Sequence, residues 1–92
     1  MALSGQNTVA AAGTAEALGT QQIAGPLLVK ALTTNTGLVY VGNDGAGDVS
    51  SSNGYPLSAG DQVIFDHVGN LSAIYIDSAV NGEGVAWLEL NA

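Results

Sequence analysis

From residue 27 onward, the sequence consists of short apolar runs separated by turn-forming residues. Each run is five to eight residues long, which is the length of a strand rather than of a helix. The runs are Leu27–Leu32, Gly37–Val41, Asp61–Val68, Leu71–Ile76 and Val85–Leu90. Asn and Gly lie between them, and Val68-Gly69-Asn70 predicts a tight hairpin because Gly and Asn tolerate positive φ. This spacing predicts an all-β fold, a small antiparallel β-sandwich or barrel.

The first 26 residues carry a weaker pattern. We divide the single domain into residues 1–26, an N-terminal arm and first strand, and residues 27–92, the β domain. The segment Ala2–Ala12 has small side chains and no charge. Such a segment can lie extended in a groove and add backbone hydrogen bonds to an exposed strand edge. Two alternatives stay open: Asn7–Ala12 is an ordinary strand of the domain, and Thr14–Leu18 is a helical turn or a second strand.

Composition excludes several classes of partner. The 92 residues are 47% hydrophobic and 10% charged, with eight acidic residues and one cation, Lys30, for a net charge of -7. Nucleic-acid binding needs several cations to displace counterions from phosphates, and an anionic membrane surface makes the same demand. We therefore expect neither partner. The absence of cysteine excludes disulfides and thiolate chemistry.

Several of the predicted strands are apolar on both faces. In the third run, Val63 and Phe65 share one face, yet Ile64 lies on the other. A chain of this size cannot cover both sides of a sheet by itself. We therefore expect self-association or coverage by a partner.

No residue pattern indicates an enzyme. The lone His67 has Asp66 beside it in sequence, but neighbouring strand residues point to opposite faces, so the pair does not form a base and its orienting group. The loop Asn43–Asp48 resembles a calcium loop but lacks the closing glutamate, which favours a glycine-rich turn. We expect no catalytic residues, no metal and no cofactor.

The aromatic residues leave a second kind of function open. Tyr40, Tyr55, Tyr75 and Trp87 could line a sugar-binding surface, since aromatic rings stack on sugars as well as fill small β cores. In that alternative the chain is a carbohydrate- or receptor-binding module whose site combines Trp87 with the loop Gly45–Gly54. The first interpretation places Trp87 in the core or in a subunit interface.

Four motifs between Leu28 and Leu90 carry a resemblance that spans about two-thirds of the chain. They are Val39-Tyr40-Val41-Gly42, Asn53-Gly54-Tyr55-Pro56-Leu57-Ser58-Ala59-Gly60, Ile74-Tyr75-Ile76 and Trp87-Leu88-Glu89. In these motifs the chain resembles small β-structured head proteins of tailed bacteriophages, among them capsid decoration or cement proteins. The chain departs from them in its long Ala- and Gly-rich segment before Leu27.

The resemblance implies a structural virion protein that is made in the host cytoplasm and located on the head surface. It implies a homotrimer that binds across major capsid subunits and stabilises the shell; a head–tail or tail component is the alternative. The residues expected to contact capsid or a sister subunit come from the N-terminal segment, one turn and the last strand. They are Ala2, Leu3, Val9, Ala10, Ala11, Tyr55, Pro56 and Trp87.

Overall fold

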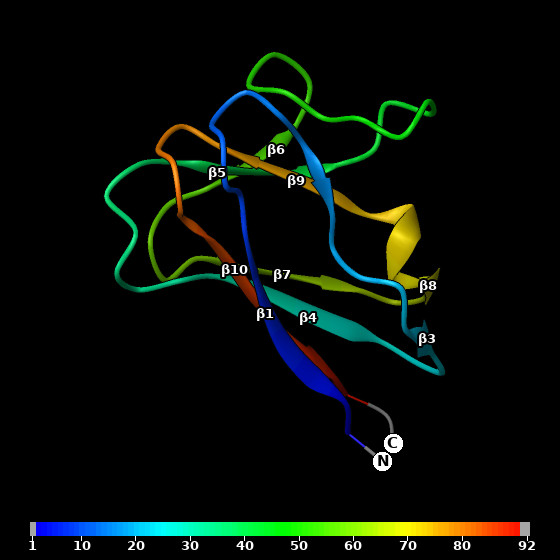
Figure 1. Ribbon diagram of the computed structural model, residues 1–92. Helices are drawn as coiled ribbons and strands as arrows, with labels where there is room; N and C mark the ends of the chain where they lie inside the picture. The colour runs from blue at the N-terminus through cyan, green and yellow to red at the C-terminus, as the bar shows by residue number, and fades with distance from the viewer. Residues whose placement is uncertain (1, 91–92) are drawn as a thin grey trace.

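The computed structural model describes residues 2–90 and shows two four-stranded sheets packed face to face (Figure 1). Sheet A contains, in order across the sheet, β1 (Ser4–Thr8), β10 (Gly84–Glu89), β4 (Leu27–Ala31) and β7 (Gln62–Phe65). Sheet B contains β2 (Glu16–Ala17), β9 (Tyr75–Ser78), β5 (Val39–Gly42) and β6 (Tyr55–Leu57). A short ladder joins β3 (Gln22–Ile23) to β8 (Gly69–Asn70). All these pairs are antiparallel, so the predicted all-β antiparallel fold is confirmed.

The core lies between the two sheets. Alternation along each strand turns one face inward: Val29 of β4 and Val85 of β10 are fully buried in sheet A, and Val39 of β5 and Ile76 of β9 are fully buried in sheet B. These side chains belong to one continuous cluster. Burial of each stabilises the fold by about 1.5–3 kcal/mol. This cluster holds the sheets together.

The prediction of a strand over Leu71–Ile76 is wrong in its first half. Leu71–Ala73 forms a single 3-10 turn (η1), and the strand β9 begins only at Tyr75. The Asn70 side chain caps the turn by accepting a hydrogen bond from the Ser72 N–H at 2.9 Å, while Leu71 is fully buried beneath it. Capping and burial together override the alternating pattern.

The predicted hairpin at Val68-Gly69-Asn70 is also wrong. Gly69 has a φ of +79°, as a tight turn requires, but the strands on either side lie in different sheets. Gly69 and Asn70 instead form β8, which pairs with β3. A further difference is β6, because Tyr55–Leu57 was expected to be part of a loop and pairs with β5.

In this structure the segment for which an arm and an ordinary strand were both left open is joined to sheet A. Ser4–Thr8 pairs along its whole length with β10. The Glu89 N–H donates to the Leu3 carbonyl at 2.8 Å, the Val9 N–H donates to the Glu83 carbonyl at 2.9 Å, and Val9 is fully buried in the core. The segment forms an edge strand of the domain, a half-buried position that its polar and small residues suit. Residue 26 is therefore not a structural boundary.

Candidate partner-binding face

The predicted contact residues Leu3, Val9 and Trp87 lie in or against the core. Trp87 is only 5% exposed, and the backbone of Gly5 on β1 lies against its indole ring. A Cβ atom at Gly5 would lie 2.9 Å from Trp87 Cζ2, so glycine is needed there for β1 to close over the ring. Trp87 therefore stabilises the domain, and only a small part of the residue is exposed.

The remaining predicted contact residues are exposed but scattered. Ala2 precedes β1, while Ala10 and Ala11 lie in the turn that follows it. Tyr55, which is 61% exposed, and Pro56 lie on β6 at the edge of sheet B. The structure does not bring these five residues together into one site.

The outer face of sheet A carries an apolar row that crosses three strands. Ile64 of β7 is paired with Leu28 of β4, and Leu28 is paired with Leu88 of β10. Ile64 is 55% exposed and Leu88 is 38% exposed, with Leu28 half-buried between them. We call Ile64, Leu28 and Leu88 the apolar row. Because residues paired across a sheet on one face lie in contact range, the three form a continuous strip.

The neighbouring row on the same face contains the one basic side chain of the sequence. Lys30 is paired with Gln62 on one side and with Ala86 on the other. A shallow apolar depression of about 120 Å³ is lined by Leu28, Lys30, Ala86, Trp87 and Leu88. This face therefore combines apolar contact area with a single positive charge, in a chain whose net charge is -7.

The loop that resembles a calcium site uses its oxygens for its own backbone. Asn43 Oδ1 accepts hydrogen bonds from the N–H groups of Gly45 at 2.8 Å and Gly47 at 3.2 Å. Asp44 Oδ1 accepts from the Ala46 N–H at 2.7 Å, and Asp48 Oδ1 accepts from the Val49 N–H at 2.8 Å. These bonds are those of turn-forming Asn and Asp residues.

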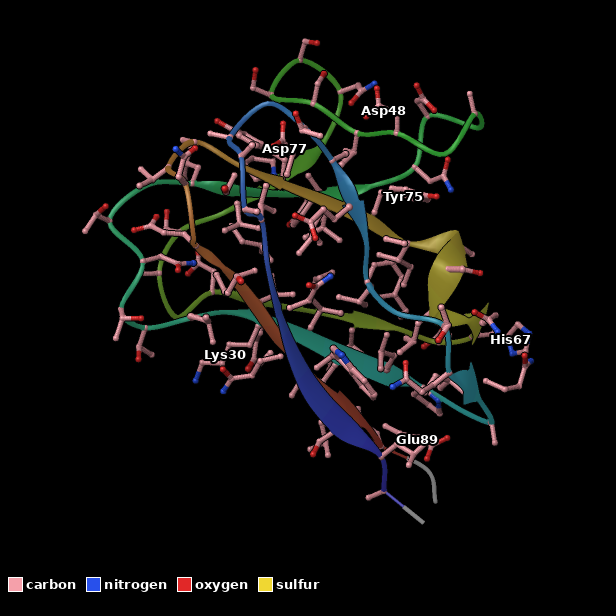
Figure 2. All side chains as sticks on the ribbon, in the orientation of Figure 1. Lys30, Asp48, His67, Tyr75, Asp77 and Glu89 are labelled. Carbon is pink, nitrogen blue, oxygen red and sulfur yellow. The ribbon has the colours of Figure 1, made fainter. Side chains whose placement is uncertain are left out.

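The titratable side chains are spread over the molecule. Figure 2 shows Lys30, Asp48, His67 and Glu89 in separate regions. Within residues 2–90, no three His, Asp or Glu side chains gather as metal ligands. In the same range, no helix has the length and apolar character needed to cross a membrane.

Hydrogen bonds from backbone N–H groups lower the pKa of two glutamates, Glu83 and Glu89. The Gly37 and Thr36 N–H groups donate to the Glu83 carboxylate at 3.0 and 2.8 Å and hold its pKa below the ordinary value. The Ala24 N–H, at 2.8 Å, and the Leu3 N–H, at 3.3 Å, lower the pKa of Glu89 in the same way. The ionised carboxylate is the better acceptor, so folding favours the charged form.

We predict that the protein loses stability in acid partly through these two groups. Their pKa values are lower in the folded chain than in the unfolded chain, so their contribution is present above the ordinary glutamate pKa of about 4.3. This contribution to stability is lost as the pH falls through the lowered pKa values of the two glutamates in the folded chain. The urea midpoint should fall between pH 7 and pH 3, and Glu89→Gln should reduce that fall while lowering the midpoint at pH 7. An unchanged fall in the variant would contradict the assignment to Glu89.

Comparison with family models, curated proteins and solved structures returns no match for this chain. The assignment of a site therefore depends on the geometry of the molecule itself. The apolar row is the feature that this geometry leaves without a partner, because sheet B covers only the inner face of sheet A. Such a face can bind another protein surface by excluding water from both.

Proposed function

We propose that this protein is a structural component of a bacteriophage head, a decoration or cement protein that binds across neighbouring major capsid subunits. The observation that carries the proposal is the apolar row on the outer face of sheet A. The resemblance of four sequence motifs to small phage head proteins supports the same function. In this proposal the protein acts through binding alone and has no catalytic role.

In the proposed mechanism the protein stabilises the shell by binding to its assembled state. A protein that binds assembled capsid subunits and not free ones shifts the equilibrium toward the assembled shell by mass action. The apolar row supplies contact area that is relatively tolerant of the partner's sequence, because water exclusion is non-directional. A rigid sheet presents this area without an ordering cost at the moment of binding.

The capsid surface that fits this face has a definite chemistry. It carries an apolar patch opposite Leu28, Leu88 and Ile64, with a carboxylate or carbonyl oxygen placed to meet Lys30. Lys30 is the one cation of a chain with eight acidic residues. The acidic residues of this chain would repel an acidic group of the capsid at any position other than opposite Lys30. Lys30 would therefore fix the orientation in which the protein docks.

The carbohydrate-binding alternative needed Trp87 and the loop Gly45–Gly54 in one site. The position of Trp87 does not support that arrangement, because its side chain is buried beneath β1 in sheet A. The loop extends from β5 of sheet B. Tyr55 is exposed on β6, but one exposed ring does not make the shelf on which a sugar stacks.

A matched pair of substitutions tests the proposal. Leu88→Lys in the apolar row should weaken binding to purified phage heads stripped of this protein by about tenfold or more, which corresponds to about 1.4 kcal/mol. Leu38→Lys is the control, because Leu38 lies outside the row and has the same 38% exposure as Leu88. Co-sedimentation of each variant with the heads gives the affinities.

A second variant, Ile64→Lys, tests the other end of the row and should weaken binding to a similar extent. Equal affinities of Leu88→Lys, Ile64→Lys and Leu38→Lys would contradict the proposed face. Binding of the unmodified protein to isolated tails and not to heads would favour the head–tail or tail alternative.

A further inference from the structure

The strand β1 is a free edge of sheet A. In an antiparallel ladder, alternate residues direct both backbone groups toward the neighbouring strand. Leu3 is bonded to Glu89 of β10 and Val9 to Glu83, which directly precedes β10, so the N–H and C=O groups of Ser4, Gln6 and Thr8 point away from β10. Within residues 2–90, β1 has no strand neighbour other than β10. Three evenly spaced residues therefore offer unpaired backbone groups along one line.

The other three sheet edges carry features that discourage strand pairing. Pro56 lies within β6, and Asp61 and Asp66 lie directly before and after β7. The edge strand β2 is only two residues long and includes Glu16. Proline, charge and short length are the usual means by which proteins protect sheet edges. The five residues of β1 include none of these features, so β1 differs from every other edge of the two main sheets.

There is space beside β1 for an incoming strand. An open groove of about 410 Å³ lies between Ser4–Asn7 and the segment Glu16–Gln21. The two segments touch where Asn7 Nδ2 donates to the Ala17 carbonyl at 2.7 Å and where the Ala10 N–H donates to the Glu16 carboxylate at 2.8 Å. In Figure 1, β1 and β2 lie on the same side of the molecule, with no other strand in front of them. Neither contact uses the outward backbone groups of Ser4, Gln6 and Thr8, so the segment that contains β2 does not occupy the free edge of β1.

We propose that β1 pairs with β1 of a second copy of this chain, antiparallel and centred on Gln6. In this register Gln6 lies opposite its own equivalent, and Ser4 lies opposite Thr8 of the second copy. The three outward residues are symmetric about Gln6, so each facing pair exchanges two backbone hydrogen bonds. A surface that complements itself in this way forms a closed two-fold dimer. The paired side chains are all uncharged and polar, which suits direct contact across a ladder.

The pairing would join two copies of sheet A into one eight-stranded sheet. The two-fold axis of an antiparallel strand pair is perpendicular to the sheet, so both outer faces would point to the same side. Each dimer would then present two apolar rows to one surface, and binding of one row would raise the effective concentration of the other. This last step depends on the proposed function, whereas the dimer itself does not.

The experiment measures self-association of the full chain in solution, without phage heads. Sedimentation equilibrium from about 10 µM to about 1 mM should detect a species of twice the monomer mass of 9.1 kDa. Because each copy carries a net charge of -7, added salt should strengthen the dimer by screening repulsion. A monomer over the whole range, or a trimer, would overturn the proposal.

Two lysine variants locate the interface. Gln6→Lys places two like charges together on the two-fold axis and should weaken the dimer at least tenfold. Gln62→Lys is the matched control, because Gln62 is also exposed and lies on the opposite edge strand of the same sheet, at the other end of the row formed with Lys30, Ala86 and Gln6. Both variants reduce the net negative charge equally. A dimer that is weakened equally by both, or by neither, would overturn the proposal.

A cross-linking measurement gives an independent result if a lysine variant folds poorly. The sequence has no cysteine, so Gln6→Cys introduces a single thiol. Hydrogen-bonded antiparallel residues have Cα atoms about 5.5 Å apart, which is within disulfide range. Mild oxidation should link Gln6→Cys at least tenfold faster than Gln62→Cys. Equal rates would contradict pairing through β1.

Discussion

Deleting residues 2–12 is expected to leave a chain that no longer unfolds as a cooperative unit. The deletion removes all of β1, and with it a fully buried core residue, Val9. It also uncovers Trp87, over which β1 closes at Gly5. Loss of Val9 burial alone costs about 1.5–3 kcal/mol, and the total stability of a domain is about 5–15 kcal/mol. The lost hydrogen bonds between β1 and β10 and the exposure of the Trp87 indole add to this cost. Together these losses approach the whole free energy of unfolding of a small domain.

Urea denaturation followed by tryptophan fluorescence measures this effect, since Trp87 is the single tryptophan of the chain. The full-length protein should show a sigmoidal transition, and the truncated protein should show a broad change or none. A double substitution, Ala10→Ser with Ala11→Ser, is the control, because both side chains are exposed in the turn after β1. A cooperative transition in the truncated protein would show that the segment is a dispensable arm after all.

The second large effect is expected at Trp87. Trp87→Ala should lower the free energy of unfolding by about 3–5 kcal/mol, because a buried aromatic ring is replaced by a cavity between β1 and the core. Trp87→Phe keeps most of the apolar volume and should cost clearly less. Far-UV circular dichroism during urea denaturation measures both variants without relying on tryptophan emission. A Trp87→Ala protein as stable as the original would mean that the ring is not part of the core.

The strands that could be predicted from sequence are those with a strong local pattern. Leu27–Ala31 and Val39–Gly42 lie in short apolar runs of strand length that turn residues separate from the next run, and this local pattern is enough to predict a strand. Leu71 and Ser72 show the limit of this approach. Their pattern suited a strand, but two contacts with a distant part of the chain hold the turn in place. Asn70 Nδ2 donates to the Thr20 carbonyl at 3.0 Å, and the N–H of the buried Leu71 donates to the Gln21 carbonyl at 3.0 Å.

The candidate face could be predicted only in part. The apolar residue Ile64, on the face opposite Val63 and Phe65, already indicated a strand with two apolar faces. Its alignment with Leu28 and Leu88 could not be derived, because the three strands are far apart in the sequence and only the sheet register brings them together. A one-residue slip in that register would move a strand's side chains to the other face.

The role of Glu89 was not predicted for a related reason. A glutamate in the last strand suggests a solvent-facing position, yet Glu89 is 4% exposed. Its carboxylate is buried because it accepts hydrogen bonds from Leu3 and Ala24, two residues from the other end of the chain. Charge patterns in a sequence do not reveal such acceptors.

The antiparallel pairing of the first and last strands also determines how the domain responds to mechanical load. Leu3 and Glu89 are bonded to each other, so a force pulling these two ends apart acts across the hydrogen bonds of β1 and β10. In that direction the bonds break one after another, beginning at Leu3, rather than all together as they would if the strands were sheared lengthwise. The domain therefore unzips easily when it is pulled by its ends. A load applied through the outer face of sheet A spreads over several strands, which suits the attachment to a shell that we propose for this face.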